Sequence, residues 1–328
     1  MLGSATWRSS FLFLSLFGLA VSQLGSSVGA QGIPTAMVPD RLDDPSYVAR
    51  LLQHATLLCD SGQTRTLKEL KLELDRGAVL EPTELCPASA SELTVPQLYS
   101  VRCRSVLTIV RLYKCNKCQN WHMGNEATAF ALNAQGVLAT CRHVFELPDD
   151  GPMIAADQDG NVFPIKEVLA TSASDDVAII RIDPTVSRPV GAPGPEPVPL
   201  RAGAPVGTAI GIVSHPGNQH YIFTRGMIAR RTIRAGGING RDSGRSQVPA
   251  TVLNVTAEFA VGSSGAPVLD DAGNAVGMVV STMTVHAEGK REGEPQMVLR
   301  NCIGAEQIQR LLQPKASVTV GAGSNAHP

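Results

Sequence analysis

The sequence of 328 residues lacks a strong net charge, a long apolar run and any internal repeat of the solenoid type. A formal net charge of −1 gives no broad basic surface, so we expect no nucleic-acid partner. The apolar run from Phe11 to Val21 is too short for a transmembrane helix, and no other stretch is longer. We therefore expect no membrane span in the mature chain. Glycine (31 residues) and proline (22 residues) are abundant, which is typical of a loop-rich β protein.

The first 30 residues have the order of features found in secretion signals. Arg8 is the only charged residue before the apolar run, and Val28-Gly29-Ala30 supplies the small residues of a cleavage site. The sequence therefore predicts a signal peptide at 1–30 and an exported protein, either periplasmic or extracellular. In such an oxidising compartment we expect some of the seven cysteines to form disulfides, with Cys59 and Cys86 as one candidate pair.

The remaining chain divides into a helical part and a part rich in short strands. Apolar residues at helical spacing predict a helix over 48–58 and a second, shorter one over 67–74. From residue 99 onward, short apolar runs on either side of a Pro- and Gly-rich segment predict a β-barrel or sandwich on each side. The predicted parts are a helical N-terminal extension at 31–98, a first β unit at about 99–185, a linker at about 186–199, a second β unit at about 200–300, a closing helix to 313, and a disordered tail at 314–328. The extension carries no catalytic signature, and we expect a protein partner to dock there.

A glycine-flanked serine lies between two predicted strands, in the stretch Gly262-Ser263-Ser264-Gly265-Ala266-Pro267. Glycines allow positive φ and a close approach of the backbone, and successive N–H groups in such a turn can hold an oxyanion. The same composition is also typical of an ordinary hairpin loop. The stretch alone therefore does not identify a nucleophile.

A serine nucleophile needs a base, and the base must be held in one tautomer. His143 follows a predicted strand closely, and Asp176 immediately precedes the apolar strand at 177–182. Asp175 is an alternative to Asp176, but alternation along a strand allows only one of the two to face the histidine. A serine, a histidine and an aspartate are thus available for one catalytic group.

Five motifs in chain order resemble trypsin-like serine proteases of the HtrA/Deg type. They are 127–130 with 136–144, then 176–180, then 209–211 with 215–217 and 224–228, then 262–267 with 273–278, and finally 301–305. The order of His143, Asp176 and Ser264 is that of the family. The resemblance covers about 99–313 and says nothing about 31–97.

The resemblance implies an all-β fold of two six-stranded antiparallel β-barrels, with a peptidase site in the cleft between them. It implies a serine endopeptidase that acts on polypeptide substrates, with Ser264 as nucleophile and His143 as general base and then general acid. Asp176 would orient His143, and the backbone N–H groups of Gly262 and Ser264 would form the oxyanion hole. A catalytically inactive binding or scaffolding protein on the same fold is the alternative.

The sequence departs from the family pattern at three places. Ala266 replaces a glycine after the nucleophile, and Ser263 stands where digestive proteases carry the aspartate that pairs with a new N-terminus on activation. We also expect no PDZ-like domain after Leu312. Glu258 would favour basic substrate side chains if it pointed into the primary pocket, and it would have no such role on the surface.

The sequence also contains motifs of two other chemistries. An α/β-hydrolase is excluded because in that fold the acid and the histidine follow the serine in the chain, whereas His143 and Asp176 precede Ser264. Cys115, Cys118 and His122 have spacing suited to zinc, with Cys141 as a conceivable fourth ligand. In an exported protein we favour disulfide pairing for these cysteines, so we expect no metal and no cofactor.

Overall fold

The computed structural model describes residues 42–76, 84–148, 150–186, 194–235, 238, 249–287 and 293–313. The predicted signal peptide, most of the first half of the predicted linker and the predicted C-terminal tail lie outside these residues. No helix within the described ranges is both long and apolar enough to cross a membrane.

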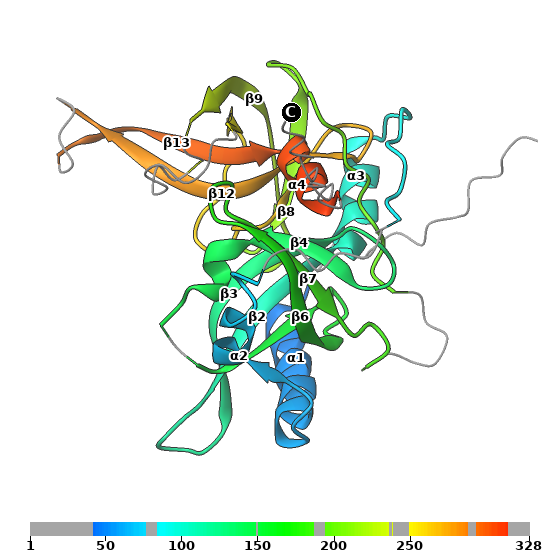
Figure 1. The fold of residues 1–328 in the computed structure, drawn as a ribbon, viewed down its shortest axis with the longest axis vertical. Helices are drawn as coiled ribbons and strands as arrows, with labels where there is room; N and C mark the ends of the chain where they lie inside the picture. Colours follow the sequence, from blue (N-terminus) through cyan, green and yellow to red (C-terminus); the bar gives the residue numbers. More distant parts are fainter. Residues whose placement is uncertain are drawn as a thin grey trace, which may run out of the picture. The chain divides into compact units, whose positions relative to one another are not determined.

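The first barrel is a ring of six antiparallel strands in the order β5-β2-β3-β4-β7-β6, closed by the pairing of β5 with β6 (Figure 1). Its strands are β2 (Val106–Lys114), β3 (Trp121–Ala131), β4 (Val137–Cys141), β5 (Pro152–Ala156), β6 (Val162–Ser172) and β7 (Val177–Ile182). Most of their apolar residues are buried, and every residue of β4 is. A two-residue strand, β1 (Arg65–Thr66), adds to the edge of β5.

The second barrel closes in the order β10-β13-β12-β11-β8-β9. Its strands are β8 (Ala209–Ser214), β9 (Ile222–Arg234), β10 (Ala250–Val255), β11 (Pro267–Leu269), β12 (Ala275–His286) and β13 (Pro295–Gly304). The outer halves of β12 and β13 leave the barrel as a two-stranded arm (Figure 1). The prediction of two six-stranded antiparallel barrels is confirmed.

Four α-helices accompany the barrels among the described residues. They are α1 (Asp44–Asp60), α2 (Leu67–Lys71), α3 (Val95–Arg102) and α4 (Ala305–Leu312), with short 3-10 turns at η1 (Cys103–Ser105), η2 (Arg142–Phe145) and η3 (Pro216–Asn218). Asp43 caps α1 by accepting the N–H of Ser46 at 3.3 Å. The helices expected at 48–58 and 67–74 correspond to α1 and α2, whereas α3 was not predicted.

The N-terminal helix packs on the first barrel. Its apolar face, formed by Tyr47, Leu51, Ala55 and Leu58, belongs to the same hydrophobic core as the strands of that barrel. Because this face is already covered, it is not available to another protein. The structure therefore gives no support to the partner docking expected at the extension.

All seven cysteines are unpaired in the structure, contrary to the expectation of disulfides. Cys59 lies in the last turn of α1, and Asp60, the last residue of that helix, accepts a hydrogen bond from Trp121 of the first barrel at 2.9 Å. Cys86 lies in the segment that packs on the second barrel, where the backbone N–H of Ser89 donates to Asn274 at 2.7 Å. The two candidate partners are thus held against different barrels. Three others, Cys103, Cys141 and Cys302, are buried in the core.

Candidate active site

The strand order of the first barrel brings His143 and Asp176 together. Strands β4 and β7 are antiparallel neighbours, and Cys141 pairs with Val177 at their shared end. His143 follows β4 in the short turn η2, and Asp176 is the residue immediately before β7. The two side chains therefore emerge from the same edge of the barrel, 33 positions apart in the sequence.

Three side chains from the two barrels form a continuous chain of hydrogen bonds. The Nδ1 atom of His143 lies 2.7 Å from Oδ2 of Asp176, and the backbone N–H of His143 donates to Oδ1 of the same carboxylate at 2.9 Å. On the other side of the ring, Nε2 lies 3.1 Å from Oγ of Ser264, which belongs to the second barrel. Because Nδ1–H donates to the carboxylate, Nε2 is free to accept the Ser264 hydroxyl hydrogen.

The environment of these groups is asymmetric. The Asp176 side chain is 4% exposed, whereas that of His143 is 39% exposed. The Ser264 hydroxyl also lies 3.4 Å from the carbonyl of Val280, a second acceptor for its single hydrogen. The imidazole is thus held by a buried carboxylate and is itself partly open to solvent.

Asp176 has a left-handed backbone, with φ of 56°. Asp and Asn tolerate this conformation better than most residues, and it often marks functional positions. The adjacent carboxylate of Asp175 accepts the Ser172 hydroxyl at 2.9 Å, and its burial raises its pKa. Of the two candidate aspartates, only Asp176 contacts His143.

The loop that carries Ser264 has a backbone that only glycine fits. Gly262 has φ of 97°, and a Cβ there would lie 2.2 Å from the carbonyl oxygen of His215. The N–H of Gly217 donates to the carbonyl of Val261 at 2.8 Å. Because N–H and C=O of one trans peptide point in opposite directions, the N–H of Gly262 faces away from Gly217.

Thr128 ties this loop to the first barrel. Its backbone N–H donates to the carbonyl of Ser264 at 2.9 Å, and its hydroxyl donates to the carbonyl of Gly262 at 2.8 Å. Its own carbonyl accepts the hydroxyl of Thr140 at 2.7 Å. A Cβ at Gly265 would lie 2.1 Å from the same carbonyl. The role of Thr128 could not be predicted from sequence, because no spacing connects residue 128 with residues 262 and 264.

The two departures near Ser264 are accommodated in the fold. Ser263 is fully buried, and its hydroxyl lies 3.0 Å from that of Ser214. A neutral hydroxyl pair thus holds the loop at the position where digestive proteases use an aspartate. Ala266 is fully buried, and its methyl group packs in the core of the second barrel.

A cavity of about 290 Å³ opens beside His143 and Ser264. Its apolar wall comes mostly from the first barrel, and its lining includes Ile109, Ala127, Val144, Leu147 and Met153. Gly262 and Val261 line the side that belongs to the second barrel. An apolar side chain of a substrate would therefore fit next to the histidine.

One wall of the cavity is supported by the N-terminal helix. Glu126 lines the cavity, and its carboxylate lies 3.0 Å from Nε2 of the buried His220. The His220 ring packs on Tyr47 of α1 with centroids 4.6 Å apart. The helical extension is therefore part of the structure that shapes the site. By contrast, the Glu258 side chain is 73% exposed and pairs with Arg300, so it has the surface position considered above.

Two groups of residues have the donor atoms for a metal ion among those the structure describes. One is Cys141 with His143 and Asp176, and the other is Cys115 with Cys118 and His122. Burial, and next the charge of Asp176, raise the pKa of the Cys141 thiol, which donates to the carbonyl of Val279 at 3.2 Å. In the first group, therefore, the thiol is held protonated and the histidine and carboxylate bind each other. The fourth zinc ligand conceived above, Cys141, belongs to this group and not to the second.

Comparison with known families agrees with this arrangement. Residues 127–278 match the model of the trypsin-like peptidase domain. The match covers just under half of the chain, reaches from β3 to β12, and includes His143, Asp176 and Ser264. The fold of the two barrels is trypsin-like, and a peptidase domain of this kind implies polypeptide substrates. A search among curated proteins found no match.

Proposed function

We propose that this protein is an exported serine endopeptidase that hydrolyses peptide bonds through Ser264, His143 and Asp176. The observation that carries the proposal is the unbroken chain from Asp176 through both ring nitrogens of His143 to the hydroxyl of Ser264, at 2.7 Å and 3.1 Å. The trypsin-like fold supports the serine-protease class. The signal pattern at residues 1–30 supports export.

In the first half of the reaction, Oγ of Ser264 attacks the carbonyl carbon of the scissile bond while Nε2 of His143 takes the hydroxyl proton. The buried carboxylate of Asp176 stabilises the imidazolium that forms. The negative charge on the substrate oxygen is stabilised by the N–H groups of Gly262 and Ser264. The tetrahedral intermediate then collapses, and the leaving amine departs with the proton from His143.

In the second half, water hydrolyses the acyl-enzyme. His143 accepts a proton from the water as its oxygen attacks the acyl carbon, and it returns the proton to Oγ as the ester bond breaks. The partial exposure of the His143 side chain gives water access to the ring. The products are a new carboxylate, a new amine and the regenerated Ser264 hydroxyl.

The cavity beside His143 indicates one feature of the substrate. The leaving amine must lie against Nε2, so the residue that follows the scissile bond is directed toward the wall that contains Val144 and Leu147. This wall is apolar. The enzyme should therefore favour an apolar residue immediately after the cleaved bond.

A fluorophosphonate probe tests the proposal, because it reacts with a serine that an adjacent base activates. Mass spectrometry should locate the label on Ser264 and not on the neighbouring Ser263. Ser264→Ala should take up no label and cleave unfolded casein about 10⁴- to 10⁶-fold more slowly. If the unmodified protein ignores the probe and cleaves no casein, the inactive scaffolding alternative replaces the peptidase. The N-terminus of the exported protein should be Gln31.

A further inference from the structure

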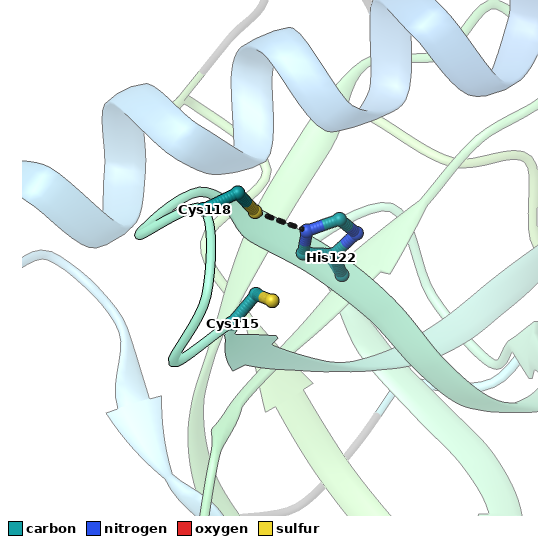
Figure 2. Close-up of side chains that lie close together, drawn as sticks. All are labelled: Cys115, Cys118 and His122. Carbon is teal, nitrogen blue, oxygen red and sulfur yellow. Dashed lines mark hydrogen bonds between the residues drawn. The ribbon is translucent and has the colours of Figure 1, made fainter.

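The hairpin that joins β2 to β3 carries a second group of chemically reactive side chains, which the peptidase reaction does not use. The sulfur atoms of Cys115 and Cys118 and an imidazole nitrogen of His122 all lie within 4.8 Å of one another. Figure 2 shows the side chains of Cys118 and His122 pointing toward each other, with Cys115 beside them. The Sγ atom of Cys118 lies 3.1 Å from Nε2 of His122.

The turn itself holds these groups together. The N–H of Cys115 donates to the carbonyl of Asn120 at 2.9 Å, and the N–H of Gln119 donates back to the carbonyl of Cys115 at 2.8 Å. Gln119 has a left-handed backbone with φ of 59°, which turns the chain sharply after Cys118. The loop between the two strands is therefore closed by its own backbone before any ligand binds.

The histidine is also positioned by its neighbours. His122 pairs with Tyr113 across the two strands, and the two rings stack with centroids 5.4 Å apart and an interplanar angle of 21°. This stacking sets the plane of the imidazole, and the contact with Cys118 sets which nitrogen faces the sulfur. The sulfur of Cys115 in turn accepts hydrogen bonds from the backbone N–H groups of Cys118 and Lys117.

The spacing of the donor atoms suits one ion. Bonds of about 2.3 Å from zinc to sulfur and about 2.0 Å to nitrogen place tetrahedral neighbours roughly 3.5–4 Å apart. The three donor atoms all lie within 4.8 Å of one another, so small side-chain shifts bring them to that separation. Two thiolates and an imidazole are soft or borderline ligands, which select zinc and similar transition metals over magnesium or calcium.

We propose that Cys115, Cys118 and His122 bind one Zn²⁺ ion, with the fourth coordination position open to water. Within the part of the chain that the structure describes, no fourth Cys, His, Asp or Glu joins the group. Cys118 is exposed, and the other two residues are half-buried, so solvent can reach the fourth position. The ion would fasten the start of β3, the strand that also carries Thr128.

Cobalt serves as the probe, because thiolate ligation to Co²⁺ gives a charge-transfer absorption that zinc lacks. Reduced, metal-free, full-length protein should bind one equivalent of Co²⁺ with this absorption, and Zn²⁺ should abolish it by displacement. The double variant Cys115→Ser/Cys118→Ser should lose the absorption. His122→Gln should weaken binding by more than about tenfold, since loss even of a residue that only supports a ligand costs 10- to 100-fold. Cys86→Ser, which alters a partly exposed cysteine elsewhere, should bind as the unmodified protein does.

Alkylation gives a second measurement that needs no variant. Zn²⁺ should protect Cys115 and Cys118 from iodoacetamide and leave the reactivity of Cys86 unchanged. Equal cobalt absorption in the double variant would overturn the proposal, and so would equal alkylation with and without zinc. A Cys115–Cys118 disulfide in protein collected after export would also overturn it, because a disulfide sulfur is not a thiolate ligand.

Discussion

Among the residues that the structure describes, cysteine and histidine lie close together in two groups, and these groups differ in what surrounds the histidine. Between the barrels, both ring nitrogens of His143 have protein partners, a buried carboxylate and a serine hydroxyl. At the hairpin tip, His122 faces the sulfur of Cys118 and stacks on Tyr113. The carboxylate leaves Nε2 of His143 facing a hydroxyl, as a general base requires, whereas a ring nitrogen of His122 lies among sulfur atoms, as metal ligation requires.

The two groups also differ in how they are assembled. The hairpin group spans eight consecutive residues and depends on one turn. The group between the barrels depends on strand pairing in the first barrel and on the contacts of Thr128 with the loop of the second. Single substitutions should therefore have large, long-range effects between the barrels and local effects at the hairpin.

Among substitutions that leave Ser264 and His143 in place, the largest effect should come from Asp176→Asn. Asparagine tolerates the left-handed backbone of residue 176, so the fold should persist. Its amide would offer a donor to Nδ1 of His143 and stabilise the wrong tautomer, and activity should fall by about 10⁴-fold. Steady-state cleavage of a fluorogenic peptide measures this loss.

The neighbouring substitution Asp175→Asn is the matched control. It removes a carboxylate one residue away that contacts Ser172 and not His143. Activity should remain within about threefold of the unmodified enzyme, as for a residue outside the catalytic group. Equal losses of activity in the two variants would mean that the contact between Asp176 and His143 has no specific role in catalysis.

The second largest effect should come from Gly262→Ala. A methyl group there would meet the carbonyl oxygen of His215 at 2.2 Å, so the peptide that offers the Gly262 N–H must move. Loss of one oxyanion-hole donor costs about 10²- to 10³-fold in turnover, and we expect a loss in that range. Turnover number and urea unfolding should be measured together.

Gly203→Ala separates crowding from backbone strain. Gly203 has a similar positive φ of 78°, but a Cβ there meets nothing within 4 Å. This variant should lose about 1–2 kcal/mol of stability from the left-handed backbone alone and keep its activity. If Gly262→Ala retained activity equally well, the N–H of residue 262 would have no part in the reaction.

A smaller effect should follow from Leu147→Ala, which enlarges the cavity beside His143. Leu147 is only half-buried, so the change should leave the fold intact. Removing part of the wall should change which substrate residue is preferred immediately after the cleaved bond. The preference for larger apolar residues at that position should rise by about tenfold. Sequencing of the new N-termini released from a peptide library measures the preference. Leu72→Ala, at a leucine that is 77% exposed, should leave it unchanged, and a shared shift would exclude this cavity as the determinant.

The part of the site that sequence predicts is the part that lies in local motifs. Ser264 lies in a glycine-flanked loop, and His143 and Asp176 lie beside strands, but their roles were predicted from the resemblance of these motifs, in chain order, to trypsin-like serine proteases. The supporting contacts do not follow in the same way. Thr128 and the carbonyl of Val280 reach Ser264 only through strand register, which sequence spacing does not encode.

The fold, like the site, was predicted only where the sequence pattern is local and continuous. Strands with continuous apolar runs, such as 177–182, were recognised from composition. Strands β5 and β6 were not, because Pro152, Pro164 and charged residues interrupt their apolar pattern. The helix α3 was missed although Thr94 and Gln97 form a capping box at its start. The disulfides were predicted from the expected compartment alone, and the segments that carry Cys59 and Cys86 contact different barrels.

The smallest effect should be on stability, and it concerns the aspartate that the reaction does not use. Burial raises the pKa of Asp175 above its ordinary value of 3.8, so the folded protein binds a proton there more tightly than the unfolded chain does. The contribution of Asp175 to folding stability is therefore most favourable below about pH 3.8, and it is lost as the pH rises through the raised pKa. Asp175→Asn removes this cost of a buried charge, and the amide oxygen can still accept the Ser172 hydroxyl.

Asp175→Asn should consequently be more stable than the unmodified protein near neutral pH. This difference in stability should shrink as the pH falls toward 3.8, the ordinary pKa of an aspartate. Urea unfolding at a series of pH values measures the difference. Urea unfolding of Asp176→Asn serves as a contrast, because that carboxylate accepts two hydrogen bonds from His143, and its loss should destabilise the fold. A destabilised Asp175→Asn at neutral pH would mean that attraction to Arg310 outweighs burial, and the two aspartates would then be alike in stability while differing in chemistry.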